Sequence, residues 1–212
     1  MKKSVALILF ILLLDQCIKI WVKTHMYLGQ EYHIAGNWAL IHFTENEGMA
    51  FGWTLPGGYG KILLSLFRIL AVVGLSYLLF GVIRKKKDTI VWVTLSLIIA
   101  GAIGNILDGT FYGLIFNESA MYGGNIAQLF PAGKGYAGLM HGKVVDMFYF
   151  PMLSGHFPSW FPGYANEPFV FFNYIFNLAD ASVSTGVGLV LLFHNKFFGM
   201  KEQNGSTLVS SD

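Results

Sequence analysis

The sequence of 212 residues has few charged side chains and a single cysteine. Charged residues make up 12% of the chain and apolar residues 54%, a balance far from that of soluble globular proteins. The net charge of +2 is too small to indicate nucleic-acid binding. Cys17 alone can form neither an internal disulfide nor a cysteine-based metal site. The composition predicts a membrane protein whose outer loops hold their shape without covalent links.

Two common catalytic motifs are also missing. There is no His-Glu-x-x-His pair to hold zinc, and His141 and His156 are typical of surface loops. There is no Gly-x-Ser-x-Gly, and His194 lies more than two helical turns from Ser182 and Ser184. The sequence therefore gives poor support to zinc or serine chemistry, and we expect no metal.

Four apolar stretches are long enough to cross a bilayer, at about 4–22, 62–83, 89–108 and 169–193. The first resembles a signal peptide, but Asp15 and Gln16 precede Cys17 where a small residue would be needed. We therefore expect an uncleaved span. An even number of spans places both termini on one side, and the lysine and arginine clusters there predict the cytoplasmic side.

Two segments, 23–61 and 109–168, must then lie outside the membrane. Trp38, Leu40 and His42 alternate with Ala39, Ile41 and Phe43 ahead of a Glu-Gly turn signal, which predicts a small β-sheet. The second segment, rich in glycine, proline and aromatics, predicts loops and short interfacial helices. The expected fold is an all-α polytopic membrane protein with a small outer sheet. Residues 1–196 form one domain, and 197–212 a disordered cytoplasmic tail.

Depth along a helix, at about 1.5 Å per residue, shows where the charges fall. Asp180 precedes Lys196 by 16 residues, about 24 Å, which places it near the outer boundary of a core about 30 Å thick. Asp108 follows Asp88 by 20 residues and reaches a similar level. An ionisable side chain within a span is costly, so these carboxylates indicate a functional site.

Other polar residues belong to the same layer. Asp15 and Lys19 are spaced i, i+4, with the acid first, which favours an ion pair. Asn105 and Asn177 stand three residues before Asp108 and Asp180. The convergence predicts one site at the outer leaflet, although isolated hydrogen bonds between helices would explain single members of the set.

Asp146, in HGKVVDMFYFP, is the candidate partner for Asp180 because its apolar flank is expected to seat at the interface. Two close carboxylates share a proton, so one can act as a general base and the other as a general acid. The alternative is a loop carboxylate that caps a backbone amide, and spacing alone does not decide between them.

Five sequence blocks, in this order, resemble the lipoprotein signal peptidases, or signal peptidase II: DQCIK, NEGMAFG, GNILD, VVDMF and FNLAD. The resemblance implies an aspartyl endopeptidase of the bacterial cytoplasmic (inner) membrane. Such an enzyme cuts a prolipoprotein just before its diacylglyceryl-modified cysteine and uses no metal or organic cofactor. It implies that Asp146 and Asp180 are the catalytic pair. It assigns lining or bracing roles to seven further residues: Asp15, Lys19, Asn46, Gly48, Asn105, Asp108 and Asn177.

The chain departs from the family pattern at two places. Gly109 stands where the GNxxD block usually continues into arginine, and Lys19, Lys143 or no residue replaces that charge. The block 123–142 looks like an insertion that forms a lid, a membrane platform or a variable loop.

Two other functions compete with the peptidase. A small transporter would use the same charges as an ion relay, but the inner halves of the spans are nearly bare of polar groups. A non-catalytic lipoprotein-binding protein would use the same groove. For the peptidase we expect a monomer whose partners are prolipoprotein substrates and membrane lipid.

Overall fold

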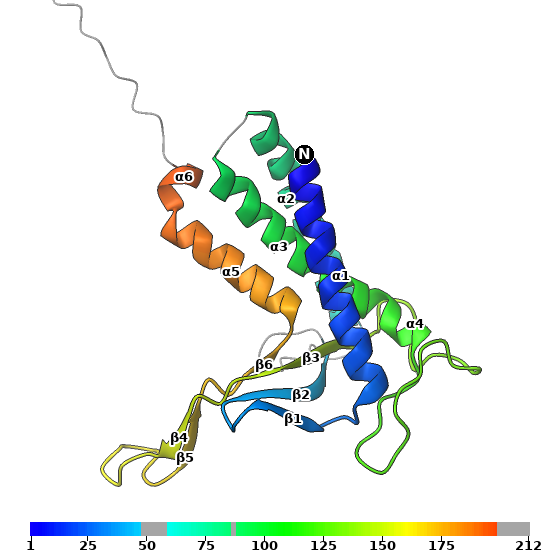
Figure 1. Cartoon of the computed structure of the whole chain (residues 1–212), viewed down its shortest axis with the longest axis vertical. Coiled ribbons are helices and arrows are strands. Elements are labelled where there is room, and N and C mark those ends of the chain that lie inside the picture. Colours follow the sequence, from blue (N-terminus) through cyan, green and yellow to red (C-terminus); the bar gives the residue numbers. More distant parts are fainter. Residues whose placement is uncertain (48–58, 86–87, 199–212) are drawn as a thin grey trace, which may run out of the picture.

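The computed structural model describes residues 1–47, 59–85 and 88–198 of the chain. A bundle of apolar helices stands on a small β-sheet, which closes one end of the bundle (Figure 1). The N-terminus and the last helix lie at the opposite end. Gly48 belongs to a stretch outside the described residues, so the role expected for it is not placed in the structure.

Four helices make up the bundle: α1 (Lys2–His25), α2 (Tyr59–Arg84), α3 (Thr89–Leu107) and α5 (Leu178–Leu192). Within the described residues, the first three are long and apolar enough to cross a membrane, whereas α5 is a shorter apolar helix. Three short helices extend them: η2 (Asp108–Tyr112), a π-helical turn, and α4 (Gly113–Ile115) after α3, and α6 (His194–Phe198) after α5.

The strands mean that the expected all-α class is not confirmed. Strands β1 (Glu31–Ala35), β2 (Ala39–Asn46), β3 (Val144–Tyr149) and β6 (Ile175–Phe176) form an antiparallel sheet in the order β1-β2-β3-β6. Strands β4 (Leu153–His156) and β5 (Pro168–Phe171) form a separate hairpin that extends away from the bundle (Figure 1). The sheet expected near residues 38–43 is present.

The last span was expected to begin at 169, but residues 168–176 contain β5 and β6, and the helix begins at Leu178. The run from 168 to 176 is apolar and aromatic, a composition that suits a strand as well as a helix. Pairing of β6 with β3 and of β5 with β4 decides in favour of strands, because it satisfies their backbone groups.

Helices α1, α3 and α5 pack closely because glycines line the face of α3. A Cβ on Gly101 would lie 2.2 Å from the carbonyl oxygen of Ala179, and one on Gly104 would lie 2.7 Å from Oδ2 of Asp15. Neither distance is tolerable for a real side chain. The absence of side chains at these two positions thus allows α5 and the Asp15 carboxylate to reach α3.

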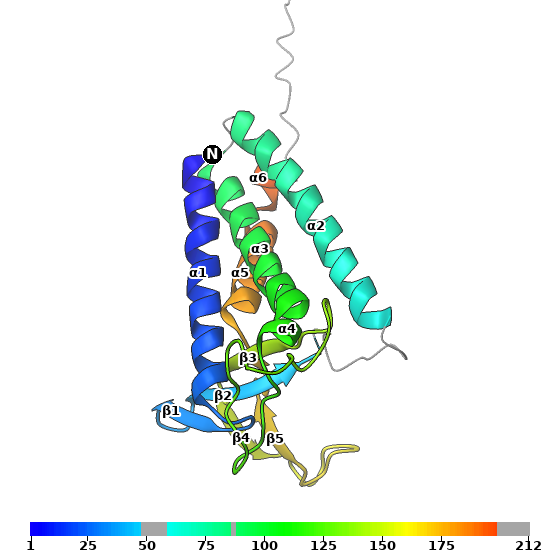
Figure 2. The same cartoon turned by 90° about the vertical axis from the view of Figure 1, so that its right-hand side faces the viewer.

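Helix α2 packs mainly against α3, through the half that ends at Arg84. Leu79 belongs to a buried cluster with Val91, Leu95 and Ile99 of α3, and Val72 and Leu75 of α2 pack against that cluster. Toward its Tyr59 end, α2 diverges from the other helices (Figure 2).

Candidate active site

Asp180 is placed by the start of α5. Asn177 is the N-cap of this helix, and its side-chain oxygen accepts a hydrogen bond of 2.8 Å from the backbone N–H of Asp180. The Asp180 carboxylate accepts in return from the backbone N–H of Asn177 at 3.4 Å. This reciprocal capping box fixes the carboxylate in the first helical turn, where the helix dipole favours negative charge.

Asp146 comes from the middle of β3, a buried strand, and not from a loop. Asp146 pairs with Thr44 of β2, and Phe148, two positions further along β3, pairs with Phe176 of β6. Phe176 directly precedes the helix cap Asn177. The pairing of β3 with β6 therefore brings the start of α5, and with it Asp180, beside Asp146.

Two asparagines bridge the carboxylates. Nδ2 of Asn177 donates to Oδ1 of Asp146 at 2.7 Å and to Oδ1 of Asn105 at 3.2 Å. Nδ2 of Asn105 donates to Oδ1 of Asp180 at 2.7 Å. Asp146 and Asn177 are buried, while Asp180 is partly exposed. The two acids thus belong to one hydrogen-bonded unit that is open to solvent on the Asp180 side.

A buried ionic group from α1 braces this unit. Nζ of Lys19 lies 2.9 Å from Asp15 and 2.8 Å from Asp108, and it donates to Oδ1 of Asn105 at 3.0 Å. Oδ1 of Asp15 accepts from the backbone N–H of Ala179 at 3.0 Å, next to Asp180. Lys19 therefore orients Asn105, and Asp15 holds the first turn of α5.

Gln16 and Tyr112 complete the brace, although no role was predicted for either residue. Nε2 of Gln16 donates to Oδ1 of Asp108 at 2.9 Å, and the Tyr112 hydroxyl donates to Gln16 at 3.1 Å. Gln16 stands between Asp15 and Cys17 in the first block, so its position beside a candidate residue was the available signal.

Asn46 also reaches the pair, from the end of β2. It pairs with Val144 two positions from Asp146, and its side chain hydrogen-bonds to the Asp146 carboxyl group. The structure therefore brings together all the expected site residues that it describes, the eight other than Gly48.

Burial and the charge of Asp180 together raise the pKa of Asp146 from 3.8 to about 7, with burial the larger cause. The hydrogen bonds from Asn177 and Asn46 and the charge of Lys19 act in the opposite direction. At neutral pH the buried Asp146 can therefore hold a proton while Asp180 faces solvent. This is the arrangement of a general acid beside a general base.

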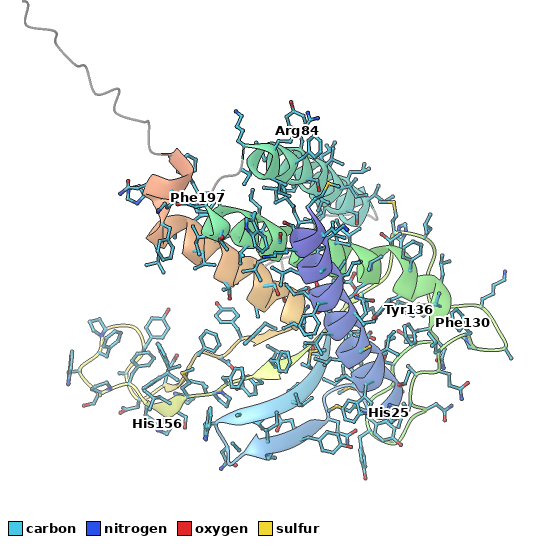
Figure 3. The ribbon with its side chains drawn as sticks, turned by 45° about the horizontal axis from the view of Figure 1, so that its top comes forward. His25, Arg84, Phe130, Tyr136, His156 and Phe197 are labelled. Atoms are coloured by element: carbon cyan, nitrogen blue, oxygen red, sulfur yellow. The ribbon has the colours of Figure 1, made fainter. Side chains whose placement is uncertain are left out.

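His156, one of the two histidines considered as metal ligands, lies elsewhere. His156 is in the β4–β5 hairpin, on the opposite side of the molecule from His25 and Tyr136 (Figure 3). Within 1–47, 59–85 and 88–198, no three His, Cys, Asp or Glu side chains gather in a way that could hold a metal ion.

Comparison with known proteins identifies the family. The sequence profile described as "Signal peptidase (SPase) II" matches residues 7–196, nearly the whole chain. The chain belongs to the signal peptidase II family. A curated relative named "Lipoprotein signal peptidase", from Porphyromonas gingivalis, is 50% identical over 98% of this chain and 89% of its own length.

A further curated relative and two solved structures match at lower identity. A "Lipoprotein signal peptidase" from Amoebophilus asiaticus is 33% identical over 90% of this chain and 76% of its own length. A solved structure described as a bacterial membrane enzyme is 21% identical, covers 96% of this chain and 94% of its own, and superposes with a TM-score of 0.63. A second, at 23% identity, covers 91% and 92% with a TM-score of 0.57. These structures support the fold.

Gly109 stands where signal peptidase II usually has arginine, and Lys19, Lys143 or no residue was expected to replace that positive charge. Lys19 does contact Asp108, but Lys143 pairs instead with Glu45 at 3.6 Å and Glu118 at 3.8 Å. Arg68 of α2, to which no role was assigned from the sequence, also interacts electrostatically with the site. Counting depth from Arg84, as was done for Asp180, would have found it.

Proposed function

We propose that this protein is a membrane aspartyl endopeptidase that removes the signal peptide from diacylglyceryl-modified prolipoproteins, cutting just before the lipidated cysteine. The observation that carries the proposal is the asparagine-bridged pair, with the pKa of Asp146 raised to about 7 beside Asp180. The names of the curated relatives support the substrate class.

The reaction proposed is hydrolysis through one water molecule. Asp180, in its carboxylate form, takes a proton from water as the water oxygen bonds to the scissile carbonyl carbon. Asp146 gives its proton to the carbonyl oxygen, which yields a tetrahedral diol. The C–N bond then breaks as the departing amine takes a proton from Asp180, and Asp146 recovers its proton from the collapsing diol.

The proposed placement in the membrane follows from the helices. We propose that α5, continued by α6, makes a fourth crossing of the bacterial inner membrane, so that both termini are cytoplasmic. The sheet and the acid pair then lie at the outer leaflet, where a lipid-anchored substrate can arrive laterally from the bilayer. A single domain over residues 1–196 suffices, acting as a monomer without a cofactor.

The test is cleavage of a synthetic diacylated peptide by purified protein. Asp146→Asn and Asp180→Asn are each expected to lower the rate by about 10²–10⁴, because each removes a proton donor or acceptor. Asp88→Asn is the matched control, since Asp88 lies before the cytoplasmic end of α3 and pairs with Lys196 at 2.6 Å. Cleavage is expected to persist in the presence of a chelator.

Retention of cleavage by either active-site variant would refute the proposal, provided that gel filtration and thermal unfolding show the variants folded. Binding of the lipopeptide without cleavage by the unmodified protein would instead support the non-catalytic binding alternative. The family match does not favour a transporter.

A further inference from the structure

The β4–β5 hairpin lies in the chain between the two candidate catalytic acids. It follows β3, which carries Asp146, and returns to β6, which leads directly into the cap of α5. Tyr149 of β3 pairs with Ile175 of β6, so the two ends of the hairpin segment, residues 150–174, are held together at the sheet. Because α5 begins at Leu178, the base of this segment lies where the helix bundle ends.

The hairpin segment carries almost no charge and many aromatic rings. Glu167 is the only Asp, Glu, Lys or Arg among its 25 residues. Nine of the 25 are phenylalanine, tyrosine or tryptophan, more than twice the 16% found in the whole chain. Many of its apolar side chains are exposed, and Met152, Leu153, Trp160 and Phe171 are each more than half exposed. Such a surface marks a site of interaction with a partner or a membrane.

The two strands of the hairpin have different faces. Leu153 of β4 lies opposite Phe171 of β5, and Ser154 lies opposite Val170. Successive side chains of a strand point to opposite faces, so Leu153 and Phe171 share one face, while Ser154, His156 and Val170 lie on the other. Leu153 is 65% exposed and Phe171 59% exposed. The hairpin therefore presents an uncovered apolar face opposite a more polar one.

The tip of the hairpin is held by its own rings. The ring of Phe157 lies 4.9 Å from that of Phe161, 5.0 Å from that of Phe169 and 5.7 Å from that of Tyr164, between centres. The backbone N–H of Phe157 also donates to the carbonyl oxygen of Glu167 at 2.9 Å. The tip thus has a defined shape from which Trp160, 77% exposed, projects.

The rest of the described chain does not cover the apolar face. Among the described helices and strands, β4 and β5 make their main contacts with each other. A two-stranded hairpin without further packing is only marginally stable in water. An uncharged hairpin that leaves Leu153 and Phe171 exposed therefore requires an apolar partner.

The direction of the hairpin identifies that partner as lipid. In Figure 1 the hairpin extends sideways from the sheet end of the bundle, across the direction of α1, α3 and α5. When these helices cross a membrane, an element with this direction lies along the membrane surface. The chain continues from the hairpin into α5, whose exposed Val187, Leu191 and Leu192 are suited to face lipid. Tryptophan and tyrosine are enriched at the headgroup level of membrane proteins, as found here at the tip.

We propose that the β4–β5 hairpin docks on the lipid bilayer, with the face of Leu153 and Phe171 and the ring of Trp160 seated at the headgroup level. This anchors β3 and β6, and with them Asp146 and Asp180, at a fixed height above the bilayer. The inference rests on the proposed function for the choice of the outer leaflet and for the use of that height, at which a lipid-anchored peptide leaves the membrane. Docking requires no acidic lipid, because the segment has no lysine or arginine.

The test measures the depth of a label on each face of β4 in nanodiscs of phosphatidylcholine. Cys17, the only cysteine, is replaced by Cys17→Ser, and either Leu153→Cys or Ser154→Cys is added. An environment-sensitive fluorophore on the new cysteine is read with and without a lipid that carries a nitroxide quencher in the upper part of its chains. The label at position 153 is expected to be quenched at least about twofold more than that at 154, because apolar faces at an interface lie about 5–10 Å into the bilayer boundary.

Phe171→Cys and Val170→Cys repeat the comparison on β5, which keeps the test valid if a substitution in β4 prevents folding. The label at position 171 is expected to be quenched more than that at 170. Addition of phosphatidylglycerol or salt is expected to leave both differences unchanged. A difference that appears only with the acidic lipid would overturn the inference.

Equal, weak quenching on both faces would also overturn the inference, because the apolar face would then lie in water. Shielding of positions 153 and 171 only in nanodiscs with two copies of the protein, or only after addition of the diacylated peptide, would assign the face to a second copy or to the substrate instead. Cleavage of that peptide with unquenched labels would overturn the docking and leave the proposed function intact. Quenched labels without cleavage would refute the proposed function and leave the docking supported.

Discussion

Burial of the Asp146 carboxyl group makes the stability of the whole protein depend on pH, because it raises the pKa of that group. Its pKa is 3.8 as an ordinary carboxyl group and about 7 in the fold. Between these values the folded state binds a proton that the unfolded chain does not bind. The free energy of unfolding therefore falls as the pH rises through this window. The loss of stability is complete above about pH 7, where Asp146 is deprotonated in both states.

Asp146→Asn removes that titration. At pH 8 we expect the variant to unfold at a higher temperature than the unmodified protein. Its free energy of unfolding is expected to be higher by about 4 kcal/mol, for a shift of about three pKa units. The gain is expected to vanish below about pH 4, where both states of the unmodified protein are protonated. Thermal unfolding in detergent at pH 4, 6 and 8 measures it. A difference that does not vary with pH would contradict the titration, and Asp88→Asn serves as the exposed control.

Local sequence patterns predicted contacts within one helix but not contacts between helices. The Asp15–Lys19 ion pair follows directly from i, i+4 spacing within one helix, and it is present at 2.9 Å. Gln16 was not identified, because it hydrogen-bonds to Asp108 at the end of another helix, which spacing within its own helix does not reveal. A depth count can place a side chain in a layer, but rotation about the helix axis decides which groups it meets.

At the level of elements, a second buried charge cluster joins the long outer segment to the bundle. Nζ of Lys23 is fully buried, contacts Glu45 of β2 and donates to the Ser119 hydroxyl at 2.7 Å. It also lies over the rings of Phe116 and Tyr136, at 5.3 and 5.1 Å from their centres. One lysine of α1 thus ties the strand next to β3 to the segment that leads into β3.

Breaking this pair from one side leaves a buried charge without its partner. Lys23→Met and Glu45→Gln are each expected to cost about 3–5 kcal/mol of stability. Lys23→Met combined with Glu45→Gln is expected to cost clearly less than the sum, because no unpaired charge remains. Thermal unfolding of the four proteins gives the double-mutant cycle.

Lys143→Met is the control for that cycle. Lys143 also pairs with Glu45, at 3.6 Å, but its side chain is 27% exposed. We expect a cost under about 1 kcal/mol for this more exposed pair. Additive costs for Lys23→Met and Glu45→Gln would show that the cluster does not act as a unit.

The outer segment has a definite architecture that its composition did not indicate. Residues in 123–142, which look like an insertion, return to the end of the bundle. There Phe130 and Ala137 donate backbone hydrogen bonds to Ile115 and Gly113 (Figure 3). The Tyr136 hydroxyl accepts from the backbone N–H of Lys143, three residues before Asp146. These contacts favour a brace behind β3 over a free lid.

For the whole molecule, the sheet lies at one end of the bundle, and the N-terminus and α6 lie at the opposite end (Figure 1). If the acid pair faces the outer leaflet, reporter proteins fused at the two ends of the bundle must lie on opposite sides of the membrane. We expect green fluorescent protein fused after Asp212 to fluoresce, and alkaline phosphatase fused after His156 to be active, because His156 is exposed in the hairpin beyond the sheet. An active phosphatase at the C-terminus would contradict the topology.

The sequence by itself determined the apolar helices, the layer of charges, the family blocks and the two aspartates, because these depend on composition, helical rise and local spacing. Only the tertiary structure decided that residues 168–176 form strands, since β6 pairs with a strand more than twenty residues earlier. It also decided that Asn105 and Asn177 bridge the two acids. The physical reason is that these contacts connect segments far apart in the chain, and the rotation and register that create them are fixed by packing rather than by local pattern.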